Sequence, residues 1–380
     1  MSGRMKMTVV ILMISFLICP FLIAGGKQEV KMEGKTEVKA ASIELPEAFR
    51  PKPGEKTIQY KARPAPYRLA FVNGFAGNAW RIQCIQTAKA WAAKPENKKY
   101  IKEFKIISTG NDIAAQIAAI DNFIAAGFDA IVFIALNPTA FDAVIKRAEK
   151  AGTVLVPFDN VLDTDAVVQV NQDQKAMGKT FAEFVVKHMK EPKGTLLEVR
   201  GLQGNATDRD RHIGAQEYLK QFPNIKVIEV VGNWDTGTTQ KVVADAIATH
   251  GKFDGIWVQF GAGGAINAVL DSGHPIVPIA GDPQNDVTTL MAKHKIPGGT
   301  TGQSPSLSAV ALQAAVYLLQ GVALPQLVLL PSPVLDNADL KEGVTYFPDL
   351  PPTFTNAFNF PTAGITFTVD EIVKQTAENQ

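Results

Sequence analysis

The sequence predicts an α/β protein made of two similar lobes, each built on a doubly wound parallel sheet. The chain has 380 residues, more than one ordinary hydrophobic core requires. From residue 67 onward, short β-rich runs alternate with helical segments, the order that produces parallel sheets with right-handed crossovers. Segments of the first half are also echoed, in the same order, by segments of the second half.

The first predicted elements show this alternation clearly. Residues 67–73 (YRLAFVN) are β-rich, and Trp80, Cys84 and Trp91 then share one face of a helix that we expect to start near Asn78. A second strand, FKIIST, and a second helix closed by a glycine follow. The continuous apolar run 129–136 (DAIVFIAL) is typical of a strand that is buried on both faces.

The same rhythm continues along the chain. Asn137 and Pro138 predict the cap and first turn of a helix that ends at Gly152, before the strand 153–159 (TVLVPFD). Each of the later β-rich runs is followed by a helical segment: TLLEVR, IKVIEVV, GIWVQF, PIVPIAG and GGTTGQ. About ten strands fit two sheets better than one.

Two pairs of segments predict that the lobes arose by duplication. Residues 129–160 and 254–283 both run from a strand opening with Asp, through a small-residue turn and a helix, to a short strand ending in Asp. Residues 72–81 and 199–211 both place Gly-Asn-Ala between a strand and a helix start. Two matches in the same order favour duplication over chance.

The N-terminus predicts export. Two basic residues precede an apolar run of about 18 residues, and small residues follow it. This order predicts that residues 1–26 are a signal peptide. The run is also long enough to remain in the membrane as an uncleaved anchor. Residues 27–65 mix charges with prolines and lack apolar periodicity, which predicts a linker or loose N-terminal arm. We expect a periplasmic protein, free or tethered through its N-terminus.

Charge and composition exclude several classes. Lys and Arg number 38 against 37 Asp and Glu, so no basic excess exists to bind nucleic acid. Two cysteines, and five histidines that are never four residues apart, provide neither a disulfide framework nor a helical metal pair. We therefore expect no nucleic-acid partner, no metal and no cofactor.

The polar residues that directly follow strands are the candidate ligand contacts, because ligands of open parallel sheets bind beyond the carboxyl ends of the strands. Two facing lobes would place these ends on either side of one cleft. Carboxylates, guanidinium groups and amides suit the hydroxyls of a sugar, and indole faces cover its C–H face. The candidates are Asn78, Trp80, Arg81, Asp159, Asn160, Arg211, Trp234, Gln259, Asp282 and Gln303, with Asn73 and Asp235 in like positions.

Structural alternatives stand beside these assignments. Asp159 and Asp282 could be helix caps or turn residues. Arg211 could be a surface residue paired with a neighbouring aspartate. Trp80 could simply pack in the core, because it shares a helical face with Cys84.

Residues 67–330 resemble the ribose-type periplasmic sugar-binding proteins. The segment Asn78-Ala79-Trp80-Arg81 stands where that family carries Asn followed by aromatics, which implies that Asn78 binds hydroxyls and Trp80 stacks on the ring. Arg211 matches the sugar-binding arginine of the family, and Trp234 stands where a stacking phenylalanine occurs. Asp282 and Gln303 match its last two ligands, in the motifs IAGD and TTGQSP.

Departures from the family pattern imply a different ligand from ribose. Arg81 replaces a second aromatic residue, and Asp159-Asn160 stands for an Asp-Arg pair. Gln259 adjoins the place where an asparagine of the family is missing. The resemblance therefore implies an intact architecture with altered specificity.

The resemblance implies a monomeric substrate-binding protein that closes on a small carbohydrate and delivers it to an ABC transporter permease. It implies Rossmann-like lobes joined by three crossings, near 165–169, 303–305 and 328–332. The N-terminal lobe would then comprise residues 66–166 and 304–330, and the C-terminal lobe residues 167–303. Residues 331–380 run past the usual end of that family, and we expect them to form an extension that packs on the lobes, either wrapping one lobe or lining the rim of the cleft.

Two alternatives remain open. The same fold could act as a ligand sensor that feeds a membrane receptor. An exported glycosidase is an alternative of another class, because Asp159 and Asp282 facing across a cleft could imitate a carboxylate pair. The polar and cationic neighbours expected there disfavour the raised pKa that a general acid needs, so we predict that the chain is not an enzyme.

Overall fold

The computed structural model describes residues 43–74 and 76–379. The predicted signal peptide, and residues 27–42 of the predicted linker, lie outside the described residues. Within the described part of the chain, no helix is both long and apolar enough to cross a membrane.

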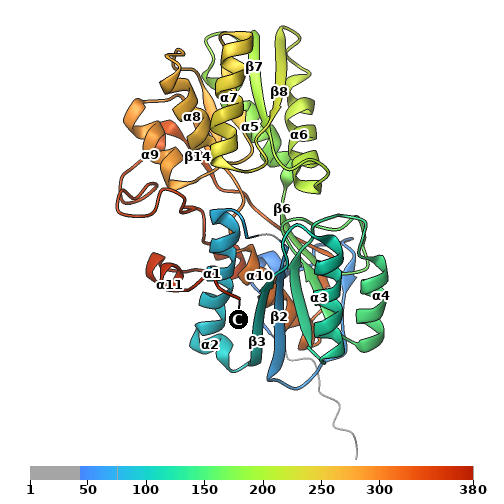
Figure 1. Ribbon diagram of the computed structural model, residues 1–380. Helices are drawn as coiled ribbons and strands as arrows, with labels where there is room; N and C mark the ends of the chain where they lie inside the picture. Colours follow the sequence, from blue (N-terminus) through green and yellow to red (C-terminus); the bar gives the residue numbers. More distant parts are fainter. Residues whose placement is uncertain (1–42, 75, 380) are drawn as a thin grey trace, which may run out of the picture. The chain divides into compact units, whose positions relative to one another are not determined.

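The first lobe is a parallel sheet with helices on both faces (Figure 1). Its four strands have the order β3-β2-β4-β5, with the bounds Tyr67–Asn73 (β2), Ile101–Ser108 (β3), Ala130–Ile134 (β4) and Val154–Pro157 (β5). One face packs on α1 (Ala79–Ala93) and α10 (Leu307–Leu319), and the other on α3 (Ile113–Ala125) and α4 (Asp142–Ala151). A short helix, α2 (Pro95–Lys98), follows α1.

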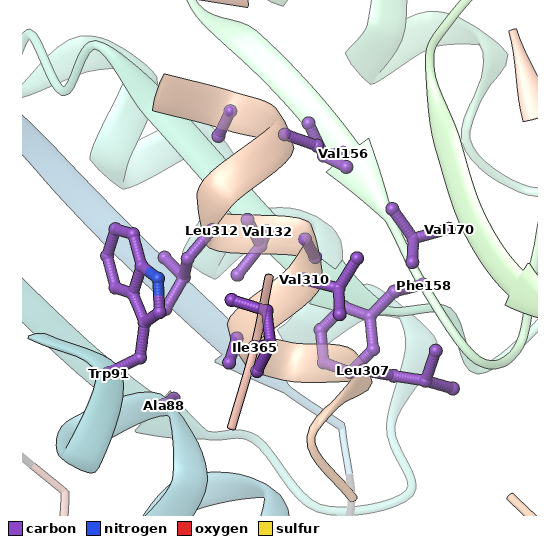
Figure 2. Close-up of a cluster of buried hydrophobic side chains, with 14 of the residues drawn as sticks. Ala88, Trp91, Val132, Val156, Phe158, Val170, Leu307, Val310, Leu312 and Ile365 are labelled. Atoms are coloured by element: carbon purple, nitrogen blue, oxygen red, sulfur yellow. The ribbon is translucent and has the colours of Figure 1, made fainter. Parts of the chain in front are cut away.

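The core on the α10 side is shown in Figure 2. Trp91 of α1, Val132 and Val156 of the sheet, and Leu307, Val310 and Leu312 of α10 gather there. Trp91 and Leu312 are 221 positions apart in sequence, so α10 belongs to the first lobe although it follows most of the second lobe in the chain. Val170 and Ile365 join the same cluster.

The second lobe is a six-stranded sheet of order β14-β11-β10-β9-β7-β8, in which only β14 is antiparallel to its neighbour among the described strands. Its strands are Gly194–Arg200 (β7), Ile225–Val231 (β8), Gly255–Val258 (β9), Ile279–Gly281 (β10), Gly298–Thr301 (β11) and Val334–Asp336 (β14). One face packs on α5 (Gln174–His188) and α6 (Ala206–Leu219). The other packs on α7 (Thr236–His250), α8 (Ala262–Asp271) and α9 (Asn285–His294). The predicted fold class is confirmed.

Local signals account for where several of the helices begin. Five helices start after an Asn or Asp whose side chain accepts a hydrogen bond from a backbone N–H of the first turn, namely Asn78, Asp112, Asp173, Asn205 and Asp235. The prediction for α4 was wrong at its start. Asn137 accepts a bond from the backbone N–H of Thr139 in a turn, and α4 begins only at Asp142.

The chain passes between the lobes at three places. They lie between β6 (Gln169–Gln172) and α5, between β11 and α10, and between β13 (Leu327–Leu330) and β14. The first crossing lies later than the predicted 165–169, because β6 pairs with β13 and Val168 and Val170 are buried in the first lobe's core. The lobe boundary predicted at residue 167 therefore moves to about residue 173.

The two flanking segments pack against the lobes. Residues 43–65 are not a loose arm: Phe49 is fully buried against Tyr317, with ring centroids 5.1 Å apart, and β1 (Thr57–Ile58) pairs with β12 (Leu324–Pro325). At the other end, β14 extends the second lobe's sheet, whereas residues 354–372 contribute large apolar side chains to the first lobe's core. Short 3-10 turns at Glu47–Phe49, Asn337–Asp339 and Pro361–Ala363, and α11 (Val369–Val373), complete these segments.

Candidate functional site

One cavity gathers all ten of the predicted site residues. The empty space between its lining residues, with the open solvent at its mouth included, is about 490 Å³. The first lobe lines it with Asn78, Trp80, Arg81, Asp159 and Asn160, and the second with Arg211, Trp234, Gln259 and Asp282, while Gln303 lies in the crossing between β11 and α10. Sequence reasoning missed its other lining residues, Thr207, Phe260, Pro283, Gly302 and Thr355.

The strand ends place several of these side chains. Asp159 and Asn160 follow β5, Gln259 follows β9, and Asp282 follows β10, so each stands at the carboxyl end of a parallel strand. Two further candidates do not line this cavity. Asn73 instead accepts a hydrogen bond from Arg81 at 3.2 Å, and Asp235 caps α7.

Two lining residues have an unusual backbone conformation. Asp159 has φ of 63° and Trp234 has φ of 54°. The left-handed region is uncommon for residues other than glycine, and such strain tends to concentrate at functional sites. The fold thus holds the carboxylate of Asp159 and the indole of Trp234 in place through a backbone conformation that these residue types rarely adopt.

Three hydrogen bonds fix the guanidinium of Arg211 in the cavity wall. Its Nε donates to Gln174 Oε1 at 2.9 Å, its Nη1 to the Gln259 carbonyl oxygen at 2.9 Å, and its Nη2 to Gln303 Oε1 at 2.7 Å. Burial lowers its pKa to about 10, which still leaves the guanidinium charged at neutral pH. Since a guanidinium has five N–H groups, two remain for a ligand.

Arg81 and Asp159 form a buried ion pair on the opposite lobe. Arg81 Nη2 lies 3.7 Å from Asp159 Oδ2, too far for a strong hydrogen bond. Burial raises the pKa of Asp159, and the nearby Arg81 and Arg211 oppose that rise. Burial likewise lowers the pKa of Arg81, which Asp159 counteracts. The wide spacing leaves both groups able to bond a ligand hydroxyl.

Asp282 has one oxygen that is satisfied and one that is not. Its Oδ1 accepts hydrogen bonds from the backbone N–H groups of Gly261, at 2.8 Å, and Ala262, at 3.1 Å, where α8 begins. Its Oδ2 is buried and has no hydrogen-bond partner among the described residues. A buried acceptor of this kind needs a donor, which a ligand hydroxyl would supply.

The pKa of Asp282 differs from the sequence-based expectation. Burial, and to a smaller extent the charge of Asp286, raise it to about 7, although the bonds from Gly261 and Ala262 oppose this. The expectation that polar and cationic neighbours would prevent a raised pKa was therefore wrong at this residue. The structural alternative for Asp282 also holds in part, because its Oδ1 caps the start of α8.

The two indoles are fixed through their N–H groups. Trp80 Nε1 donates to the Gln303 carbonyl oxygen at 2.9 Å, and Trp234 Nε1 donates to Gln259 Oε1 at 3.2 Å. A Cβ atom on Gly201 would lie only 2.0 Å from Trp234 Nε1, so this glycine makes room for the indole. Because the N–H groups are engaged, the rings can offer a ligand their apolar surface.

The amides of the cavity keep donors free. Asn78 Oδ1 accepts a hydrogen bond from the Arg81 backbone N–H at 3.0 Å, and Asn160 Oδ1 accepts one from Thr207 Oγ1 at 2.8 Å. Each acceptor is therefore occupied, while each NH₂ group can donate to a ligand. Thr207 lies two residues after Asn205, the N-cap of α6. This helix-start signal could have identified Thr207 as a lining residue from the sequence.

A cluster that could hold a metal ion lies outside this cavity. Glu198, His212 and Glu229 are the one such group found among the described residues. Arg200 already approaches both of its carboxylates, with its Nη1 2.8 Å from Glu229 Oε2 and its Nε 3.6 Å from Glu198 Oε1. The guanidinium supplies the positive charge that a cation would bring, so this cluster is an ion-pair network.

The chain is similar to known binding proteins. The family model described as "Periplasmic binding protein domain" matches residues 69–323. A xylitol-binding protein of Mycolicibacterium smegmatis is 26% identical over 180 residues, 46% of this chain and 51% of that protein, so the match spans about half of that relative. A galactofuranose-binding protein of Escherichia coli is 26% identical over 219 residues, 55% of this chain and 67% of that protein. Among solved structures, an ABC transporter solute binding protein from Thermobispora bispora is 25% identical with a TM-score of 0.67, covering 72% of this chain and 86% of that one.

Proposed function

Because this chain belongs to the periplasmic binding protein domain family, we propose that it is an extracytoplasmic solute-binding protein that closes on a small carbohydrate and delivers it to an ABC import permease. Export through residues 1–26 would bring it to the periplasm as a monomer. The relatives described above are named as binding proteins, which supports a non-enzymatic role.

The observation that carries this proposal is the set of unsatisfied polar groups in one cavity. Arg211 retains two N–H groups, Asn78 and Asn160 retain NH₂ groups, and Asp282 Oδ2 has no donor among the described residues. A cavity lined by free donors, a free acceptor and two indoles matches a polyhydroxylated ring better than an apolar or a strongly charged ligand.

Closure follows from the division of these groups between the lobes. A ligand that touches Asn78 and Asp159 on one lobe and Arg211 and Asp282 on the other makes all of its contacts only when the lobes are close together. Differential binding of this kind shifts the population toward the closed form. A permease could then recognise the loaded protein by its closed conformation.

A thermal-shift screen of the chain from residue 27 tests the proposal. The panel contains D-ribose, D-xylose, L-arabinose, D-galactose, xylitol and myo-inositol, with NaCl as a negative control. A ligand at a hundred times its dissociation constant adds about 2.7 kcal/mol to the free energy of unfolding, which raises the melting temperature measurably. No shift with any of the panel would contradict the carbohydrate assignment.

The same samples distinguish binding from hydrolysis. The glycosidase alternative gains some support from the raised pKa of Asp282, since a general acid requires one. We expect an aryl glycoside of each stabilising sugar to stay intact on overnight incubation, as measured by release of the aryl group. Catalytic release that Asp282→Asn abolishes would favour the enzyme.

A further inference from the structure

The C-terminal extension contributes a wall to the cavity. Thr355 lines it, although this residue lies outside the matched region 69–323 and is distant in sequence from every strand end considered above. Its side chain is 1% exposed, and its Oγ1 is buried without a hydrogen-bond partner among the described residues. A buried hydroxyl at the edge of a polar cavity is therefore left unsatisfied, as is Asp282 Oδ2.

The backbone around Thr355 is held firmly on the first lobe. Gln83, a buried residue of α1, accepts a hydrogen bond from the Thr355 backbone N–H at 2.8 Å through Oε1. The same amide donates through Nε2 to the Thr355 carbonyl oxygen at 3.1 Å. This two-point contact fixes the position of the residue relative to α1.

The same segment is also held on the second lobe. The helix α9 has no side-chain cap, and the N–H groups of Asn285 and Asp286 donate instead to the carbonyl oxygens of Phe354 and Pro352, both at 2.8 Å. The Asn356 N–H donates to the Pro283 carbonyl oxygen at 3.0 Å. Residues 347–358, which we call the strap, thus connect α1 to α9 beside the cavity.

We propose that Thr355 is a ligand-contacting, specificity-determining residue that the strap adds to the sugar site. Its hydroxyl exchanges a hydrogen bond with a ligand hydroxyl that lies between Thr355 and Asp282. This inference rests on the proposed carbohydrate function. It follows that the extension influences which sugars fit, because Thr355 is part of the cavity lining.

Calorimetric titration of the chain from residue 27 with the six panel compounds tests this inference. Thr355→Val keeps the β-branched shape and removes the hydroxyl, so the dissociation constant of the tightest-binding compound should rise about threefold to tenfold, the range for one neutral hydrogen bond. Thr355→Ser, which keeps the hydroxyl, should stay within about twofold of the unmodified chain. Thr355→Ala, which cannot crowd the cavity, should lose affinity as Thr355→Val does.

A matched control lies in the same extension. Thr362 Oγ1 is likewise buried without a partner among residues 43–74 and 76–379, but it does not line this cavity. Thr362→Val should leave every affinity unchanged, and the melting temperature of ligand-free Thr355→Val should not fall. Equal sugar affinities of Thr355→Val and the unmodified chain would overturn this inference alone. Failure of the unmodified chain to bind any of the panel would overturn it together with the carbohydrate function.

Discussion

At the scale of single residues, ionisation of Asp282 should make the stability of the protein depend on pH. Its pKa is raised from the ordinary 3.8 to about 7, chiefly by burial. A carboxyl group with a higher pKa in the folded state contributes stability that is fully present below about pH 4 and is lost as the pH rises through about 7. The ligand-free protein should therefore become less stable across this interval.

Asp282→Asn should remove that part of the pH dependence. We expect the free energy of unfolding by urea to fall from pH 5 to pH 8 more steeply in the unmodified chain than in the variant. Asp286, whose pKa burial raises to about 6, titrates in the same direction in both proteins, so the variant should keep a smaller fall of its own. Parallel pH profiles would show that Asp282 is ionised normally.

The same substitution should weaken sugar binding. A ligand O–H that donates to Asp282 Oδ2 would meet an NH₂ group instead, and two donors would face each other. We expect a loss of at least tenfold in affinity at pH 8, since a hydrogen bond to a charged group contributes about 1.5–3 kcal/mol. In the unmodified chain, affinity should rise with pH from 6 to 8, because the ligand favours the ionised carboxylate.

At the scale of elements, the start of α1 serves structure and ligand together. Asn78 both caps the helix through Oδ1 and lines the cavity. Asn78→Ser keeps a capping oxygen but removes the NH₂ group, so it should preserve the free energy of unfolding and weaken sugar binding. Asn78→Ala should weaken sugar binding and should also lower the free energy of unfolding by about 1 kcal/mol. Chemical denaturation measures the free energy of unfolding, and calorimetry measures the sugar affinity. Equal affinities in the unmodified chain and both variants would show that Asn78 does not contact the ligand.

The sequence allowed most strands and strand-end residues of the lobes to be predicted. The strand 67–73 was predicted with the bounds it has, and all ten candidates line one cavity because parallel strands bring their carboxyl ends to one edge. Whether these residues bind the ligand stays a prediction. The order of the motifs made this prediction possible, since the motifs follow β-rich runs along the chain.

Other features depend on contacts that local patterns do not contain. The arm around Phe49 and the strap around Thr355 follow no periodic pattern, and their positions come from packing against residues more than 250 positions away. The first crossing was placed too early because β6 is recognised only through its pairing with β13. The raised pKa of Asp282 likewise depends on burial among residues from separate elements.

At the scale of the whole molecule, the extension is part of the hydrophobic core as well as of the cavity. Phe354, Phe358, Phe360, Ile365, Phe367 and Ile372 are buried in the first lobe's core. Burying one large apolar side chain contributes about 1.5–3 kcal/mol, so the six together contribute about 9–18 kcal/mol, a sum comparable to the usual net stability of about 5–15 kcal/mol. The two lobes should therefore not fold stably without this segment.

A chain that ends at Asp336 tests this dependence. We expect it to lack a cooperative thermal transition in circular dichroism, because removal of the six side chains exposes the facing surfaces of α1 and α10. A chain that ends at Gln375 is the matched control. It loses only exposed contacts, such as that of Lys89 with Thr376, and should melt within a few degrees of the unmodified chain. A chain ending at Asp336 that melts cooperatively at the original temperature would mean that the lobes are stable alone, and that the extension acts only on the ligand.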